Sequence, residues 1–304
     1  MTTAFTLGSH NVNGIRAAMR RGFRSFWDAE DTEVIALQEV RCSLGDLPAE
    51  AFEGYHTSLD VGTLPGRNGV AVMTRHAPTA VRTLSGTALH ADPGGRFSEV
   101  ETTRIPNRDL AAFSHEGRYL EVDLSDVPVR VASLYLPKGA APPFDEAKDQ
   151  AKYERKMRFL KGLSRLLTAS RRDAATAGRH FVVVGDFNVA HTRMDLKNWR
   201  TNQRSEGFLP EEREWFSSVV GPRRLIDVTR HLHPGVDGPY TWWSWRGQSF
   251  TNDVGWRIDY QLASPALARS AISARVARES DYDARISDHS PVLVRYDLGL
   301  MSSE

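Results

Sequence analysis

The stretch FVVVGDFN, residues 181–188, decides how the rest of the chain is interpreted. Its four consecutive apolar residues, Phe181 to Val184, predict a strand that is buried on both faces. Asp186 and Asn188 follow with Phe187 between them, so the two polar side chains can point the same way while the ring packs behind. Polar groups at the end of a buried strand lie where α/β proteins often bind ligands, although Gly, Asp and Asn are also turn residues.

Polar side chains also lie at the ends of five other predicted strands, either after or just before the strand, which favours a shared function over ordinary loops. These strand ends are FTLGSHNVNG (5–14), EVIALQEV (33–40), VRVASLYLPKG (129–139), WRIDYQL (256–262) and SDHSPVLVRY (287–296). They supply Asn11, Glu39, Tyr135, Asp259, Asp288 and His289.

Length and composition allow one large domain or two small ones. Because the polar strand ends are spread over both halves and must converge, we expect a single domain spanning residues 1–304. The chain is 40% hydrophobic over 304 residues, enough for a sizeable core. A net charge of +1 means that any binding of nucleic acid must come from local clusters. The single cysteine, Cys42, excludes an internal disulfide and suits a reducing compartment. No signal-peptide pattern and no apolar run of ~20 residues is present, so we expect a cytoplasmic protein that does not enter membranes.

The periodicity predicts helices between the strands. Strands at 4–10 and 33–37 flank a helix at 15–29, and further helices are expected at 145–169 and 210–219. Shorter strands and turns fill residues 55–131, with a surface loop or hairpin early in 85–115. The pattern predicts a four-layered α/β sandwich, with two mixed β-sheets packed face to face and helices outside. On the helix at 145–169 we expect a solvated basic face formed by Lys152, Arg155, Lys156, Arg158 and Lys161.

Seven blocks resemble the exonuclease III class of DNA-repair nucleases, which includes the apurinic/apyrimidinic (AP) endonucleases of the endonuclease/exonuclease/phosphatase superfamily. They are HNVNGIRA (10–17), LQEVRC (37–42), SLYLPKG (133–139), GDFNVAHTRMDLKN (185–198), GFLPEEREW (207–215), VGWRIDY (254–260) and SDHSP (287–291). Each block alone is weak evidence for the family, but the seven occur in the family's order and together span almost the whole chain. The resemblance implies a monomeric, Mg²⁺-dependent phosphodiesterase, with Mn²⁺ as a substitute. Such an enzyme cleaves DNA 5′ to abasic sites or removes 3′ blocking groups and nucleotides.

The chemistry of phosphodiester hydrolysis fits the same residues. Hard Mg²⁺ prefers one or two carboxylates together with water and substrate oxygens. Glu39 is expected to be the principal metal ligand and Asp288 a second-site or water-mediated ligand. Asn11, close by, is expected to contribute to the same metal site.

Five side chains are expected to perform the catalysis. Asp186 would orient and deprotonate a water, with Asn188 holding it by hydrogen bonds. His289 would donate to a phosphate oxygen, with Asp259 as its partner. Tyr135 could donate to the phosphate as a phenol or assist the attack as a phenolate.

The resemblance also implies DNA contacts in three places. The residues concerned are Arg16, Arg20 and Arg21 near the backbone, Asn198 and Asn202 in the loop after GDFN, and Trp242 and Trp256 in a pocket for an extruded abasic sugar. The chain departs from the family at Lys138, where a neutral amide is usual, and at Asn13, where some relatives carry Asp.

Two other readings predict different sequences. A phosphoesterase of the same superfamily that acts on RNA, inositol phosphate or sphingolipid is expected to lack DLKNWRTNQRSEGF and VGWRIDY, and both are present. A non-catalytic binding module would lack Glu39, Asp186, Asp259 or His289, and none of them is lacking.

Overall fold

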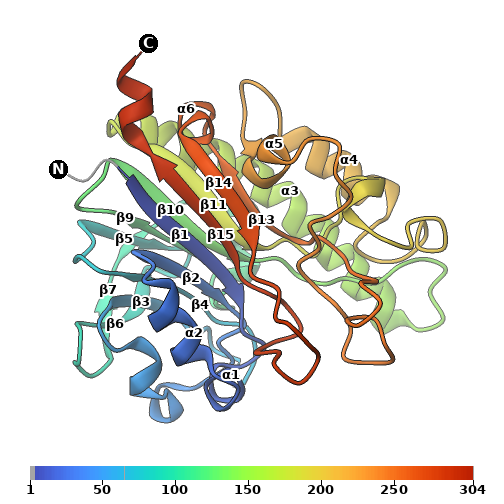
Figure 1. Ribbon diagram of the computed structural model, residues 1–304, viewed down its shortest axis with the longest axis horizontal. Helices are drawn as coiled ribbons and strands as arrows, with labels where there is room; N and C mark the ends of the chain where they lie inside the picture. Colours follow the sequence, from blue (N-terminus) through green and yellow to red (C-terminus); the bar gives the residue numbers. More distant parts are fainter. Residues whose placement is uncertain (1–3, 65, 304) are drawn as a thin grey trace.

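The computed structural model of the chain describes residues 4–64 and 66–303, and two mixed β-sheets form its centre (Figure 1). The eight-stranded sheet has the order β14-β15-β1-β2-β4-β3-β6-β7, and the seven-stranded sheet has the order β12-β13-β11-β10-β9-β5-β8. In the first sheet β1 pairs in parallel with β2, and in the second β10 pairs in parallel with β11. The prediction of two mixed sheets is confirmed.

The strands and helices lie where apolar periodicity and turn residues place them. The strands are β1 (Ala4–Asn11), β2 (Val34–Gln38), β3 (His56–Asp60), β4 (Val70–Thr74), β5 (Ala80–Thr83), β6 (Thr87–Ala91), β7 (Ser98–Glu101), β8 (Thr103–Arg104), β9 (Tyr119–Asp123), β10 (Val129–Tyr135), β11 (His180–Asp186), β12 (Ile226–Asp227), β13 (Asp259–Ala263), β14 (Ala271–Val276) and β15 (Val292–Asp297). The α-helices are α1 (Ile15–Arg20), α2 (Phe23–Glu30), α3 (Ala147–Thr176), α4 (Pro210–Val219), α5 (Val228–Leu232) and α6 (Pro265–Arg269).

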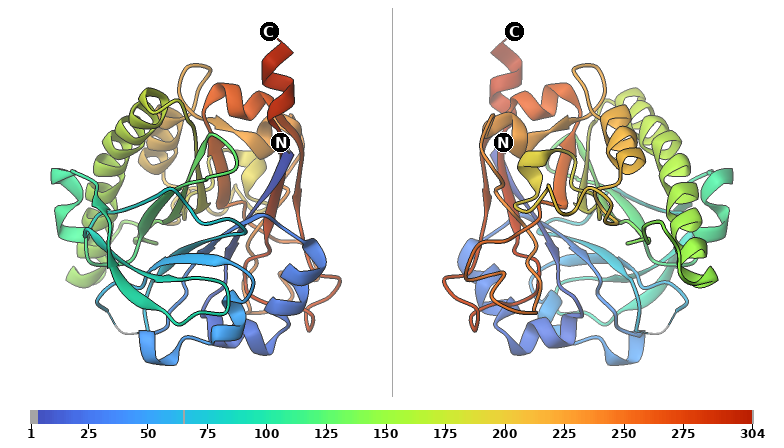
Figure 2. Two further views of the ribbon diagram at one scale, coloured as in Figure 1. Left: turned by 90° about the vertical axis from the view of Figure 1, so that its left-hand side faces the viewer. Right: turned by 90° about the vertical axis from the view of Figure 1, so that its right-hand side faces the viewer.

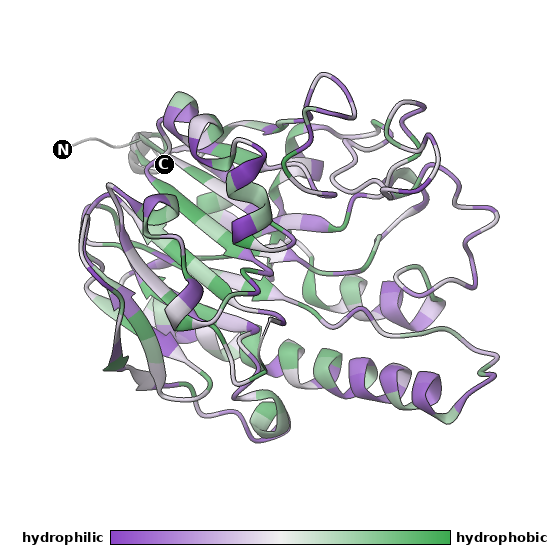
Figure 3. Cartoon of the chain, turned by 90° about the horizontal axis from the view of Figure 1, so that it is seen from below, coloured by the Kyte–Doolittle hydropathy of each residue, from purple (hydrophilic) through white to green (hydrophobic). Residues whose placement is uncertain are grey.

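Strand β11 contributes to two apolar cores, as its run of apolar residues predicts. Val182 and Val184 belong to the core between the two sheets, whereas Phe181 and Val183 face the core under α3 and α4. A third core packs α1 and α2 on the eight-stranded sheet. Figure 2 shows these two pairs of helices on opposite sides of the molecule, and Figure 3 shows hydrophobic strands inside and hydrophilic outer surfaces. The layers are therefore helix, sheet, sheet and helix.

Two predicted helices have different bounds in the structure. The helix expected at 15–29 is broken into α1 and α2, because Gly22 has a φ of 92° and starts α2 in the left-handed region. Helix α3 continues to Thr176 beyond the end of the leucine stripe, and stops before Gly178, whose φ is 70°. Within 85–115, β6 and β7 pair as the expected hairpin. Helix α4 has its predicted bounds.

Buried polar contacts fix the two sheets relative to each other. Ser133 Oγ on β10 donates to the Leu37 carbonyl on β2 at 2.9 Å, and Gln261 Nε2 on β13 donates to the Leu7 carbonyl on β1 at 2.8 Å. Buried polar groups are costly unless they are paired, so sliding of one sheet over the other is opposed. This alignment holds the carboxyl ends of β1, β2, β10 and β11 at one edge of the sandwich.

None of the helices in the described part of the chain is long and apolar enough to cross a membrane.

Gly185 near the end of β11 lies tightly against its neighbour β10 in the same sheet and against Gln38 of the other sheet. Its φ is 133°, and a Cβ added there would lie 2.1 Å from the Leu134 carbonyl oxygen. We expect Gly185→Ala to lower the free energy of unfolding by at least about 2 kcal/mol, measured by urea denaturation. Gly178→Ala is the matched control, because that site also has a positive φ but no atom within 4 Å of the added Cβ. Its loss should be about 1 kcal/mol. Equal losses at both sites would refute the importance of the close approach.

Candidate active site

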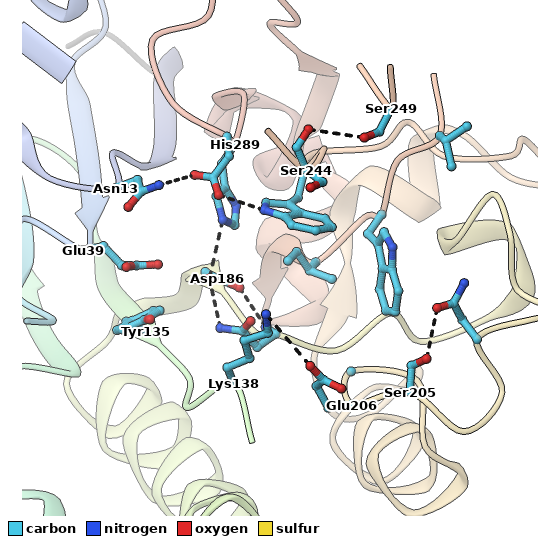
Figure 4. Close-up of a pocket in the computed structure, with 18 of the residues that line it drawn as sticks. Asn13, Glu39, Tyr135, Lys138, Asp186, Ser205, Glu206, Ser244, Ser249 and His289 are labelled. Atoms are coloured by element: carbon cyan, nitrogen blue, oxygen red, sulfur yellow. Dashed lines mark hydrogen bonds and ion pairs between the residues drawn. The ribbon is translucent and has the colours of Figure 1, made fainter. Parts of the chain in front are cut away.

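The carboxyl ends of four strands and two loops bring the predicted site residues together. Figure 4 shows Glu39, Asp186 and His289 pointing into one space, from different parts of the chain. They lie at one end of a cavity of about 530 Å³, whose lining also includes Tyr135 and Asn188. Glu39 and Asn188 both have positive φ, 53° and 47°, which is uncommon for residues with side chains and often occurs at functional sites.

Asn11 links carboxylates that come from the two sheets. Its Nδ2 donates to Glu39 Oε1 at 2.8 Å and to Asp186 Oδ2 at 3.0 Å. Its Oδ1 accepts from the backbone N–H of Asn13 at 3.0 Å, so the carbonyl oxygen is already engaged. The geometry therefore favours a positioning role for Asn11 over the metal contact expected from the sequence.

Asn188 holds the Asp186 carboxylate from the other side, as its spacing in the sequence predicts. Its backbone N–H donates to Asp186 Oδ1 at 2.8 Å and its Nδ2 donates to Oδ2 at 3.0 Å. The same amide donates to the Leu136 carbonyl at 2.9 Å, which fixes it to the loop after β10. Burial raises the pKa of Asp186 above its ordinary value, so this carboxylate is a stronger base than an exposed one.

His289 forms a buried pair with Asp259, which comes from the start of β13. Its Nδ1 lies 2.8 Å from Asp259 Oδ2, and Thr241 Oγ1 donates to the same oxygen at 2.6 Å. Burial alone would lower the pKa of His289, but the charge of Asp259 and their hydrogen bond raise it to about 10. His289 is therefore protonated at neutral pH, with Nε2 3.9 Å from Asp186 Oδ2.

Tyr135 is a neutral phenol at the same edge. Burial, and then the charges of Glu39 and Asp186, raise the pKa of Tyr135 well above its ordinary value. The Arg118 guanidinium lies 5.0 Å from the ring centroid, on the face of the ring. Of the two forms that the sequence left open, the phenol is the form present at neutral pH.

Two carboxylates, Glu39 and Asp186, are placed to hold a divalent cation beside the protonated ring of His289. One atom each of Glu39, Asp186 and His289 lie within 4.8 Å of one another. Glu39 Oε2 forms an ion pair with Arg41 and has no hydrogen-bond partner within the described parts of the chain. Two carboxylates suit a hard cation such as Mg²⁺, whereas the protonated ring of His289 has no lone pair to offer one.

Asp288 is committed to other contacts. Its Oδ1 accepts from Asn13 Nδ2 at 2.8 Å and its Oδ2 accepts from Trp242 Nε1 at 3.1 Å. Burial alone would raise the pKa of Asp288, but His289 and these two hydrogen bonds lower it, so the carboxylate is charged. These two hydrogen bonds hold the Asp288 carboxylate beside Asn13 and Trp242.

The residues expected to contact DNA divide into two groups. Trp242, Trp256 and Asn202 line the cavity, and the two indole rings meet edge to face with centroids 6.3 Å apart. The others lie outside the cavity on exposed surface: Arg16, Arg20, Arg21 and Asn198. Arg21 stacks on the Trp245 ring at 4.7 Å, which extends the arginine surface toward the tryptophan-rich loop.

Lys156 is a supporting residue that the sequence analysis placed wrongly on the solvated face. It is completely buried, and its Nζ donates to the backbone carbonyls of Lys138 at 2.9 Å and Asn188 at 2.8 Å. Glu212, also completely buried, lies 2.5 Å from the ammonium. The sequence does carry a signal for this burial. Lys156 precedes Phe159, Leu160 and Leu163 by three, four and seven residues, which places it on the apolar face of the helix.

Lys138, one of the two departures from the family pattern, lies at the surface. It lines the cavity with 68% of its side chain exposed, and its Nζ lies 3.9 Å from Glu206 Oε1 (Figure 4). The cation therefore faces the opening of the cavity from the loop that follows β10.

Comparisons with known proteins place the chain in one family. Residues 8–289 match the endonuclease/exonuclease/phosphatase family. An exodeoxyribonuclease of Bacillus subtilis is 29% identical over 286 residues, which cover 93% of this chain and 96% of that protein. A DNA-(apurinic or apyrimidinic site) endonuclease of Dictyostelium discoideum is 28% identical over 291 residues, covering 95% of this chain and 70% of that protein.

Two solved structures are similar to this chain over nearly its whole length. A 3′-5′ exonuclease from Neisseria meningitidis superposes with a TM-score of 0.74 at 25% identity, covering 96% of this chain and 99% of that chain. A 3′ phosphatase from Neisseria bound to a product DNA hairpin has the same TM-score, identity and coverage.

The Lys156–Glu212 ion pair gives a stability prediction. Lys156→Met leaves a buried carboxylate without its cation, so the free energy of unfolding should fall by about 3–5 kcal/mol in urea denaturation. The double variant Lys156→Met/Glu212→Leu removes both charges and should recover part of that loss. A single variant as stable as the parent protein would show that the pair is not important for folding.

Proposed function

The chain belongs to the endonuclease/exonuclease/phosphatase family, and we propose that it is a metal-dependent DNA-repair phosphodiesterase of the exonuclease III type. One observation carries the proposal: ligand atoms of Glu39, Asp186 and His289 converge within 4.8 Å, and the same cavity is lined by Trp242 and Trp256. The first group suits phosphodiester hydrolysis, and the second suits a base-free sugar. Support for DNA as the substrate comes from the names of the exodeoxyribonuclease and AP endonuclease relatives and from the related 3′ phosphatase bound to DNA.

Metal binding is assigned to Glu39, with Asp186 beside it. When bound, Mg²⁺ or Mn²⁺ supplies charge neutralisation for the phosphate and the leaving oxygen. Asp288 is assigned an indirect role, through water or through its hold on Trp242.

The side chains divide the rest of the reaction between them. Asp186, fixed by Asn11 and Asn188, accepts a proton from the attacking water. His289, kept protonated by Asp259, donates to a non-bridging phosphate oxygen as negative charge develops there. Tyr135 donates its phenolic hydrogen to the same phosphate from β10, the strand beside β11.

Substrate selection is assigned to the aromatic wall and the surface arginines. The rings of Trp242 and Trp256 together with Ile258 form an apolar wall against which a sugar without a base can pack. Arg16, Arg20 and Arg21 lie on the exposed surface around α1 and would contact the DNA backbone. Lys138 at the cavity opening is placed to attract a phosphate at a 3′ end.

The activity is tested with a labelled duplex that carries one abasic-site analogue, incubated with Mg²⁺ or with EDTA. We expect incision just 5′ of the analogue that EDTA abolishes. An undamaged blunt duplex and a duplex with a 3′-phosphate, run in parallel, rank exonuclease and phosphatase activities against AP endonuclease activity. If the protein cleaved no DNA but hydrolysed an inositol phosphate, a sphingolipid or RNA, that compound would replace DNA as the proposed substrate.

The role of Asp186 gives a second test. Asp186→Asn keeps the size of the side chain but removes the base, so kcat should fall by at least about 1000-fold. Affinity for the abasic duplex, measured by fluorescence anisotropy, should stay within a few-fold of that of the parent protein. Asn198→Ala is the matched comparison, because this exposed residue is assigned to DNA contact and should weaken binding more than kcat. If Asp186→Asn lost binding and cleavage together while remaining folded, Asp186 would be a binding residue.

A further inference from the structure

A second group of side chains with metal-ligating atoms lies on β3 and just after β6, where His56, His90 and Asp92 meet. Strands β3 and β6 are antiparallel with Ser58 opposite His90. Because side chains alternate along a strand, His56, Ser58, His90 and Asp92 all project from the same face of the sheet. The backbone pairing therefore sets the spacing of these three groups.

The group lies at the opposite end of the sheet from the candidate active site. His56 pairs with Thr74, which in turn pairs with Val34 at the start of β2. Glu39 follows the other end of β2. This register separates the two groups, and Figure 1 shows β3 and β6 together near one margin of the fold.

The three ligand atoms are close together and open to solvent on one side. His56 Nδ1 lies 2.8 Å from Asp92 Oδ1, and His90 Nε2 lies 3.5 Å from the same oxygen. The side chains of His56, His90 and Asp92 are 20%, 26% and 72% exposed, so an ion can enter and can keep a water ligand. Within residues 4–64 and 66–303, the contacts found for the Asp92 carboxylate are those with the two histidines.

The donor set selects the type of ion. Two imidazole nitrogens and one carboxylate oxygen suit Zn²⁺, which binds nitrogen ligands at ~2.0–2.1 Å, whereas Mg²⁺ prefers oxygen ligands. The Ser58 hydroxyl lies 3.5 Å from His90 Nδ1, an outer contact that orients the ring with Nε2 toward Asp92. Hydrogen bonds from His56 and then His90 lower the pKa of Asp92, so its carboxylate is ionised at neutral pH.

We propose that His56, His90 and Asp92 bind a Zn²⁺ ion, with water as the fourth ligand. The ion joins β3 to the chain just after β6, and so fastens the hairpin of β6 and β7 to the edge of the sheet. That hairpin is paired to β3 only from Thr57↔Ala91 to Leu59↔Leu89, so a cross-link at the end of this pairing opposes fraying. The site gives a structural role to the start of the 85–115 excursion and does not depend on the proposed nuclease function.

The test uses the full chain, stripped with EDTA and dialysed, and titrated with Zn²⁺ by calorimetry. Cobalt(II) is the second probe, because its visible absorption reports nitrogen coordination. Glu39→Ala serves as the parent variant, so that Zn²⁺ binding at the candidate active site is weakened. His56→Ala and the isosteric Asp92→Asn are compared with His76→Ala, which removes an exposed histidine outside the group. Circular dichroism verifies that each variant is folded.

We expect one Zn²⁺ to bind the parent variant and to raise its Tm. His56→Ala and Asp92→Asn should each weaken that binding by more than about 10-fold, and Ser58→Ala by about 10-fold through its effect on His90. His76→Ala should change nothing, and Mg²⁺ should not compete at equal concentration. The proposal would be overturned if folded Asp92→Asn bound Zn²⁺ with the same affinity and Tm shift as His76→Ala. It would also be overturned if the parent variant bound no Zn²⁺.

Discussion

The candidate active site depends on holding two carboxyl groups close together, and the Asn11 side chain holds them there. Glu39 and Asp186 come from different sheets, and their carboxyl groups approach within 4.8 Å, where two negative charges repel each other. Burial and the charges of Asp259 and Glu39 raise the pKa of Asp186 in response. The Asn11 amide donates one hydrogen bond to each of them, which offsets part of this repulsion and fixes both groups. A cation at the same place offsets the remainder, so the side chains alone form an incomplete site that a metal completes.

The fold delivers these groups because each sheet has a parallel pair of strands at its centre. Strands β1 and β2 end beside β10 and β11, and the polar contacts of Ser133 and Gln261 between the sheets prevent slippage. Strand β13 pairs antiparallel with β11 and brings Asp259 level with Asp186. A displacement of one residue in either sheet would turn these side chains to the other face.

Sequence reasoning reached the layers and the polar strand ends because both depend on local patterns. The alternation around Asp186 and Asn188 and the four apolar residues before them specify a buried strand with a polar end. Contacts between residues that are far apart in the sequence leave no local pattern and could not be predicted. In the sequence, the Asn11 side chain could equally be a metal ligand or a hydrogen-bond donor. Only its distances to Glu39 and Asp186 distinguish the two roles. Lys156 was assigned to solvent because charge outweighed helical spacing, although a buried acid 56 residues later accepts its ammonium. Gly22 in turn broke a helix whose apolar stripe was continuous in the sequence.

The pairing of β1 with β15 has a consequence for how the protein is made. Residues 4–9 pair with residues 292–297, almost the whole described length of the chain away, and Asn11 and His289 flank that pairing. A ribosome releases β1 long before residues 292–297 have been synthesised, so β1 lacks one neighbour throughout that interval. A catalytic centre that includes His289 therefore cannot form before residue 289 has been synthesised. Contacts this distant in sequence also slow folding, and β1 exposes an unpaired edge until β15 closes that side of the sheet.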